Sequence, residues 1–484
     1  MSKAGRIPFI AKTASAAWLF AVAGLAIAGS ASAQEPAPAS CSLKPVEFDG
    51  FAAQELSNEW LKLDIVPQLG GRLMQVTFAG HAYLFVNPEF KGKYIPPPDD
   101  PKGKWFNYGG DKIWPMPEGD DDAEHWPGPI ADQLDDGTYV LTAVFNREES
   151  NDETGKEKPR HTCGVRLQGP ADKRTGLQYR REIWIADGSP EIHFRAVMKN
   201  ASEHPIKWSM QTVSQYDTAD ATDPTTYNKN FWAFTPVNPQ SEYFAQFQVR
   251  DGLANDPSFQ VKDGLFRLHW LPLQNEVWLD STAGWVAIID HASQFAMVER
   301  YVYHPGGDYP GKASVIFYKN GPSFGLNDKG LPTLHGEPGD DPFYMEAELN
   351  SPLVPLAPGE SYNMDTTWSP TRAGDSFADV RAIGIVDKPL TLTTGGGRNI
   401  LGGEFSVFES GHLAALYFGK LSSPDGRANS EQLVAARPDK IATLENFIHI
   451  PAGTTRVEVH LISEAGSDLG TLSELQIGAS GGAE

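Results

Sequence analysis

The chain has 484 residues and a formal net charge of −22 at pH 7, which argues against a DNA or RNA partner, because binding to phosphates depends on Lys and Arg. Its length suits two domains. The 11% of aromatic residues, the 47 glycines and the 37 prolines favour a turn-rich β protein over a helical one.

Residues 1–33 have the pattern of a cleaved secretory leader. Three basic residues precede the apolar run AAWLFAVAGLAIAG, and the small residues Ala31, Ser32 and Ala33 favour cleavage after Ala33. The apolar run is too short and too rich in Ala and Gly for a convincing membrane span. We therefore expect an exported protein, periplasmic or secreted, without stable membrane insertion.

The mature chain is expected to begin with a linker over residues 34–54, which contains one of the two cysteines. Cys41 and Cys163 are the only cysteines in the sequence. In an oxidising compartment they suit a single disulfide that ties the N-terminus to the body of the protein, and two free buried thiols are the alternative. One cysteine in each segment cannot build a Cys-rich metal site.

Short segments of alternating apolar residues recur along the chain. Examples are WLKLDIVP, TYVLTAVFN, LQYRREIWIAD, EIHFRAVMKN and ASVIFYKN, and most are bounded by Gly, Pro, Asn or Asp. This period of two predicts half-buried antiparallel strands, and the absence of alternating helices argues against a parallel α/β fold. We predict an all-β domain over residues 55–372, a break near residues 368–384 and a small β-sandwich over residues 380–480.

Residues 106–129, FNYGGDKIWPMPEGDDDAEHWPGP, combine aromatic rings, carboxylates and one lysine in a proline-rich loop. Trp114 and Trp126 are flat surfaces that suit stacking on sugar rings, although tryptophans in a packed loop also serve as core anchors. Lys112 could pair with the carboxylate of a uronic acid. Glu118 can accept hydrogen bonds from hydroxyls. The three aspartates that follow either hold a hard cation or are solvated.

The segment FYMEAELNSPLVPLAPGESYNMDTTWSP, residues 343–370, resembles the closing segment of aldose 1-epimerases, also called galactose mutarotases. The similarity extends over residues 55–370 and implies a large antiparallel supersandwich with a carbohydrate cleft on a concave sheet. Glu346 falls on the catalytic-base position of that family. Arg72, after two glycines, matches a region in which arginines of the superfamily reach the cleft.

A bacterial branch of this superfold, known as domains of unknown function, is more similar still. It shares GGDKIWPMPE, HWPGP, AGWVAIID and MEAEL followed by LAPGES, in this order. Fold and chemistry separate easily, so this likeness implies the fold and leaves the reaction open.

The predicted chemistry depends on two glutamates with the same strand parity. Glu346 and Glu348 would point to one face of the sheet, where two nearby carboxyls push their pKa values apart and so separate acid and base roles. The alternative is a strand edge with solvated acids. Glu346 is the expected catalytic base, and Glu348 is expected to bind the substrate.

The histidine that supplies the acid in the epimerases has no counterpart in NASEHPIKWSMQTVSQYD. Gln211 and Gln215 occupy that region, and they can hydrogen-bond a sugar but cannot protonate it at neutral pH. His125 is the residue of the loop that could replace the missing acid. No His-x-x-x-His spacing suggests a zinc helix. We expect no cofactor and no metal among the site residues, and cation binding by the three aspartates stays open.

Three functions remain open at this point. The first is a carbohydrate-active enzyme that transfers protons on a sugar or sugar acid, like an epimerase. The second is a non-catalytic glycan-binding protein of the cell envelope, which the missing histidine favours. The third is a polysaccharide lyase, which usually needs a tyrosine or histidine base and a group that neutralises charge.

Overall fold

The structure is a computed structural model, and it describes residues 40–98, 105–120, 122, 124–149, 160–334, 342–395, 398–419 and 427–477. The expected leader, residues 1–33, lies outside the described residues. Within the described part of the chain, none of the helices combines the length and apolar character needed to cross a membrane.

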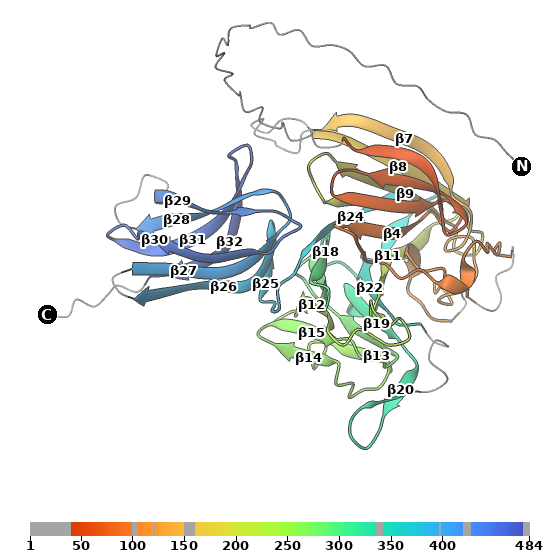
Figure 1. Cartoon of the computed structure of the whole chain (residues 1–484). Coiled ribbons are helices and arrows are strands. Elements are labelled where there is room, and N and C mark those ends of the chain that lie inside the picture. Colours follow the sequence, from red (N-terminus) through yellow and green to blue (C-terminus); the bar gives the residue numbers. More distant parts are fainter. Residues whose placement is uncertain are drawn as a thin grey trace, which may run out of the picture. The chain divides into compact units, whose positions relative to one another are not determined.

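Nearly all of the regular structure is antiparallel β-strand, which confirms the predicted all-β class. The described helices are two single turns of 3₁₀ type, η1 (Pro88–Phe90) and η2 (Pro310–Lys312). Every strand pair in the sheets is antiparallel, as expected where short alternating segments are joined by Gly- and Pro-rich turns (Figure 1).

The N-terminal sheet has five strands in chain order: β1 (Ser42–Phe48), β2 (Phe51–Ser57), β3 (Leu61–Val66), β4 (Arg72–Phe78) and β5 (His81–Ala82). Residues 42–54 were expected to form a linker, but they are β1 and the start of β2. Asp49 and Gly50, with φ of 47° and 84°, form the two-residue turn between them. Asp-Gly is a typical sequence for such a hairpin turn, because both residues tolerate positive φ.

Two larger sheets pack face to face and enclose the main core. The ten-stranded sheet has the order β14 (Phe259–Lys262), β15 (Leu265–His269), β12 (Phe231–Pro236), β17 (Trp285–Asp290), β18 (Phe295–Tyr301), β24 (Ser361–Arg372), β10 (Ile192–Asn200), β9 (Leu177–Ala186), β8 (Arg160–Ala171) and β7 (Val140–Glu149). The seven-stranded sheet comprises β13 (Gln248–Gly252), β16 (Asn275–Leu279), β19 (Val315–Asn320), β22 (Tyr344–Asn350), β11 (Ile206–Asp217), β23 (Val354–Leu356) and, paired with β11, β6 (Asp111–Met116).

The alternation of side chains along β22 separates the core from a second face of its sheet. Met345, Ala347 and Leu349 are fully buried members of the main core. Glu346 and Glu348 therefore point away from that core, because successive strand residues face opposite sides. This second face carries the candidate site.

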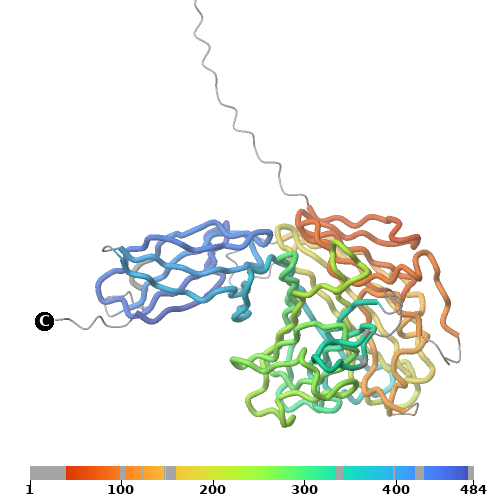
Figure 2. The backbone as a smooth tube through the Cα atoms, turned by 60° about the horizontal axis from the view of Figure 1, so that its bottom comes forward, coloured from red at the N-terminus to blue at the C-terminus, as the bar shows by residue number. Residues whose placement is uncertain are grey.

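Residues 379–476 form two four-stranded sheets with a hydrophobic cluster between them (blue in Figure 2). One sheet contains β25 (Asp379–Arg381), β26 (Gly384–Gly395), β27 (Arg398–Val407) and β30 (Ala442–Ile448), and the other contains β29 (Arg427–Ala436), β28 (Gly411–Gly419), β31 (Thr454–Ser463) and β32 (Asp468–Gln476). A hairpin of β20 (Ser323–Leu326) and β21 (Pro332–Leu334) is a sheet of its own.

Cys41 and Cys163 form a disulfide across 122 residues of sequence, so of the two alternatives the structure has the disulfide. A cross-link over so long a loop removes conformational freedom from the unfolded chain.

We expect Cys163→Ser to lower the free energy of unfolding by about 2–4 kcal/mol, because the substitution removes this cross-link. Urea denaturation with and without a reductant measures the effect. The reductant should shift the midpoint of the native protein and leave that of the variant unchanged. Equal midpoints for the oxidised native protein and the variant would show that the disulfide does not stabilise the fold.

Candidate functional site

A cleft of about 260 Å³ opens on the outer face of the seven-stranded sheet. Strands β6, β11, β16, β19 and β22 supply its floor, and loops around β6 supply one wall. The lining side chains are those of Trp105, Trp114, Met116, Glu118, Pro129, Gln211, Glu276, Ile316, Tyr318, Tyr344, Glu346 and Glu348. Aromatic rings and four carboxyl groups thus share one concave surface.

Strand register explains why these residues meet. Glu346 of β22 lies opposite Tyr318 of β19 on one side and Gln215 of β11 on the other, and Tyr318 lies opposite Glu276 of β16. These four residues form one row across four neighbouring strands. Glu348 is two residues along β22 and therefore has the same orientation as Glu346.

Lys112 connects the loop segment to this row. Its Nζ donates to Glu346 Oε1 at 2.8 Å, and Gln215 Nε2 donates to the same oxygen at 2.6 Å. The ammonium group lies 4.9 Å from the centroid of the Trp105 ring and 4.6 Å from that of Trp114. Burial lowers the pKa of Lys112, while the neighbouring Glu346 acts in the opposite direction. The carboxylate of Glu346 is thus held by two donors.

The other carboxyl groups of the cleft retain their protons more strongly than usual. Burial, followed by the nearby Glu276 and Glu346, raises the pKa of Glu118 to about 8, against the opposing effect of Lys112. Burial also raises the pKa of Glu348 well above its ordinary value, with the charge of Glu346 as the next cause. Glu348, whose neutral form burial favours, and Glu346, which pairs with Lys112, therefore project from the same strand.

The raised pKa of Glu118 predicts a pH-dependent cost to stability. The folded protein keeps a proton that the unfolded chain releases above its ordinary pKa, so the free energy of unfolding falls as the pH rises from about 4.5 to about 8. Glu118→Gln lacks this contribution. The free energy of unfolding of the variant, measured relative to that of the native protein, should therefore rise by on the order of 2 kcal/mol from pH 5 to pH 8.

Urea denaturation at pH 5 and at pH 8 measures this difference. Asp122→Asn is a suitable control, because hydrogen bonds from the Glu124 backbone and the His125 ring lower the pKa of this exposed carboxyl instead. The same dependence on pH in the native protein and in Glu118→Gln would contradict the assignment.

Unused hydrogen-bonding groups lie on two residues of the cleft and on the neighbouring Gln215. Gln211 Nε2 donates to Glu348 Oε2 at 2.6 Å. Within the described part of the chain, Gln211 Oε1, Gln215 Oε1 and Trp114 Nε1 are buried and have no hydrogen-bond partner. Buried polar groups are rarely left unpaired, so Gln211 Oε1 and Trp114 Nε1, on residues that line the cleft, are candidate partners for a ligand.

The structure places Arg72 beneath the cleft rather than in its lining. The guanidinium is fully buried, donates to Asp135 Oδ1 at 2.7 Å and Asp136 Oδ1 at 3.0 Å, and also donates to the Gly109 carbonyl. Asp135 Oδ2 in turn accepts from Trp105 Nε1 at 2.9 Å. Arg72 therefore supports the wall of the cleft through Asp135 and does not itself reach the cleft.

Trp126 and His125 are also absent from the lining. Trp126 is fully buried, donates to Asp132 at 2.8 Å and packs against Trp114 with ring centroids 5.4 Å apart. It is a core anchor, the alternative that the sequence left open. His125 Nδ1 contacts the carboxylate of Asp122 at 2.9 Å outside the cleft. Glu348 and Glu118 are the candidate acids instead, because their pKa values are raised.

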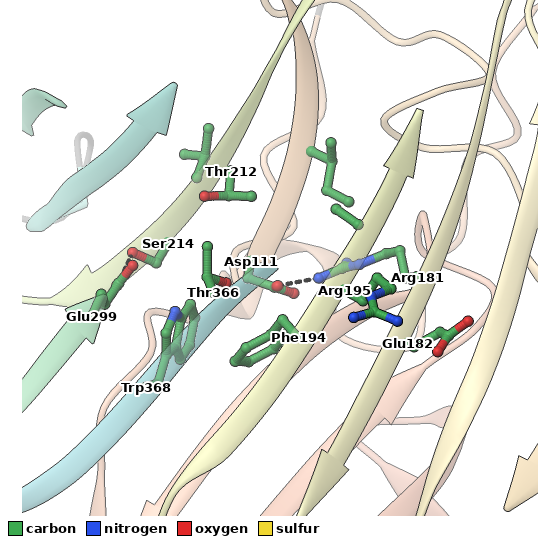
Figure 3. A pocket seen from close by; sticks show the side chains of 13 residues that line it. Asp111, Arg181, Glu182, Phe194, Arg195, Thr212, Ser214, Glu299, Thr366 and Trp368 are labelled. Carbon is green, nitrogen blue, oxygen red and sulfur yellow. Dashed lines mark hydrogen bonds and ion pairs between the residues drawn. The ribbon is translucent and has the colours of Figure 1, made fainter. Parts of the chain in front are cut away.

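A separate buried polar cluster lies between the two large sheets (Figure 3). Asp111 pairs with Arg181, and Glu299 accepts from Ser214 at 2.6 Å and from Tyr216 at 2.5 Å. Burial raises the pKa of Glu299 to about 7. The space there is only about 20 Å³, room for a water molecule and far too small for a sugar. This cluster is structural.

Comparison with known proteins gives similarity of structure at low sequence identity. A galactose mutarotase-like protein from Clostridium acetobutylicum is 12% identical, with a TM-score of 0.44, over 69% of this chain and 99% of that protein. A galactose mutarotase-like protein from Lactobacillus casei is 10% identical, with a TM-score of 0.37, over 68% of this chain and 99% of that protein. No family model and no curated protein matches the chain. We transfer no functional role from these proteins.

Proposed function

We propose that the cleft binds a sugar ring and that Glu346 and Glu348 move protons to and from it. Aromatic side chains suit the apolar face of a sugar, and carboxyl and amide groups suit its hydroxyls. The observation that carries the proposal is the contrast between two neighbouring glutamates of β22. Glu346 accepts hydrogen bonds from Lys112 and Gln215, whereas burial favours the neutral acid at Glu348.

The simplest reaction for such a pair is interconversion of sugar anomers. Glu346 would accept the proton of the anomeric hydroxyl while Glu348 donates one to the ring oxygen. The bond from the anomeric carbon to the ring oxygen then breaks, its electron pair stays on that oxygen, and an aldehyde forms. Reclosure on the other face of the carbonyl returns both protons. Side chains two residues apart on a strand are separated by roughly 7 Å, a span that a pyranose ring can bridge.

Non-catalytic binding of a glycan is the second candidate, and one observation favours it. The Lys112 and Gln215 donors already occupy Glu346 Oε1, as in a structural ion pair. A lyase is less well supported, because burial raises the pKa of Tyr318, the tyrosine beside Glu346, and so makes its ionisation harder.

Two steps test the proposed reaction. Thermal-shift screening of monosaccharides and short glycans identifies binders by the rise in melting temperature that any ligand of the native state produces. Exchange between the anomers of each binder is then followed by NMR. Faster exchange with the native protein supports catalysis. Binding without faster exchange supports the glycan-binding alternative, and no binding at all overturns both.

We also propose export, on the basis of the leader. The mature protein should then begin at Gln34. N-terminal sequencing of protein recovered from the periplasm or medium of a bacterial expression host tests this, and an intact Met1 would contradict it.

A further inference from the structure

Building on the proposed function, we propose that the preferred ligand is an amino sugar whose protonated amino group binds among the carboxyl groups of the cleft. The inference concerns the class of sugar. It depends on an imbalance between hydrogen-bond donors and acceptors in the cleft.

The side-chain N–H donors of the cleft are almost all used within the protein. Lys112 and Gln215 donate to Glu346, and Gln211 Nε2 donates to Glu348. The indole of Trp105 donates to Asp135, so its N–H is also in use. Among the side-chain N–H groups of the described lining, Trp114 Nε1 is the one left without a partner.

Acceptors, by contrast, remain available. Gln211 is only 1% exposed and lines the cleft, and its Oε1 has no partner among the described residues. The carboxyl groups of Glu118, Glu276, Glu346 and Glu348 border the same space. An ammonium group offers three donors and no acceptor, which complements this arrangement.

The acidic groups around the site favour a cation, because a bound cation stabilises their carboxylate forms. Besides the four glutamates, Lys112 of β6 faces the cleft from below, where its charge is already opposed by Glu346. On the side of β13, Asp251 raises the pKa of Glu276 and Arg250 lowers it. Burial raises the pKa of Tyr318 on β19, which keeps its hydroxyl neutral. A uronate would instead meet several carboxyl groups. The structure therefore argues against the suggestion from sequence that Lys112 pairs with a sugar acid.

Binding of a cation would also ionise a neutral acid. The pKa of Glu118 is raised to about 8, so an ammonium nearby favours its carboxylate form and releases a proton at pH 7. Glucose carries no charge and would release none. Proton release thus separates amino-sugar recognition from simple hydrogen bonding.

Isothermal titration calorimetry at pH 7 tests the proposal with glucosamine, N-acetylglucosamine, glucose and glucuronate, each in two buffers of different ionisation enthalpy. We expect glucosamine to bind about tenfold more tightly than glucose or N-acetylglucosamine. Of the four sugars, only glucosamine should show an apparent binding enthalpy that differs between the two buffers. Glucosamine binding no tighter than glucose, or glucuronate binding tightest, would overturn the inference while leaving sugar binding intact. No binding by any of the four would also overturn the inference, and the proposed function falls only if the thermal-shift screen finds no sugar at all.

Glu118→Gln is the matched variant, because it keeps the size of the side chain and resembles the neutral acid. It should lose most of the preference for glucosamine over glucose and all of the proton release. An unchanged preference in this variant would overturn the role of Glu118 in recognising the amino group.

Discussion

Replacing Lys112 with methionine is expected to lower the free energy of unfolding by about 3–5 kcal/mol, since it leaves the buried Glu346 without its cation. Lys112 is 2% exposed and Glu346 is 4% exposed, so water cannot compensate. Urea denaturation measures the loss. The double substitution Lys112→Met with Glu346→Gln should recover more than half of it, because no buried charge is then left alone.

Lys319 is the matched control for this experiment. It is a fully buried lysine on the core side of β19, and it donates to Asp256 and Ser258 at 2.6 Å each. Lys319→Met should cost a similar free energy without changing sugar affinity in molecules that remain folded. If Lys112→Met lowers the free energy of unfolding by less than about 1 kcal/mol, the ion pair with Lys112 does not stabilise the buried Glu346.

Glu346→Gln is expected to slow anomer exchange by about 10²- to 10⁴-fold, because an amide cannot accept the proton. Affinity for the sugar should stay within about tenfold, since the amide keeps the size and one acceptor oxygen of the carboxylate. NMR exchange measures the rate, and calorimetry measures the affinity. The separation of rate from affinity identifies Glu346 as a group that acts on the reacting atoms.

Glu299→Gln is the matched control here, because Glu299 is a buried glutamate that lies between the large sheets, away from the cleft. It should leave the exchange rate within about twofold of the native value. An exchange rate that Glu346→Gln leaves intact would remove Glu346 from the mechanism, whatever its effect on stability.

The positions of Glu346 and of the Lys112 loop were predictable, because the segments around both residues have strong local sequence signals. The period of two along FYMEAELN placed Glu346 and Glu348 on one face, and the structure confirms that both line the cleft. The expected approach of the Lys112 loop to Glu346 is confirmed as well, at 2.8 Å. Tyr344 has the same strand parity and could have been added by the same reasoning.

Glu276 and Tyr318 were missed because their place depends on sheet order. Strands β16, β19, β22 and β11 are neighbours in the sheet but not in the sequence, and short alternating strands do not reveal which ones pair. Burial was the second difficulty. Arg72 and Trp126 have the chemistry of binding residues, but they donate to Asp135, Asp136 and Asp132 inside the protein.

One error was avoidable from the sequence alone. The Asp49-Gly50 pair stands between SLKPVEF and FAAQELS, and this is the usual local signal of a hairpin. The linker expected over residues 34–54 overlooked it. The charged residues of both segments fit strands with one solvated face.

The most direct measurement is a crystal structure of the protein with a bound sugar, obtained with the tightest binder found by calorimetry. We expect a sugar ring against Trp114 and Tyr318, with its polar atoms within hydrogen-bond distance of Glu346, Glu348 and Gln211. A sugar bound elsewhere, for example in the groove of the C-terminal sheet beside Ile400 and Phe447, with no sugar in the cleft, would contradict it.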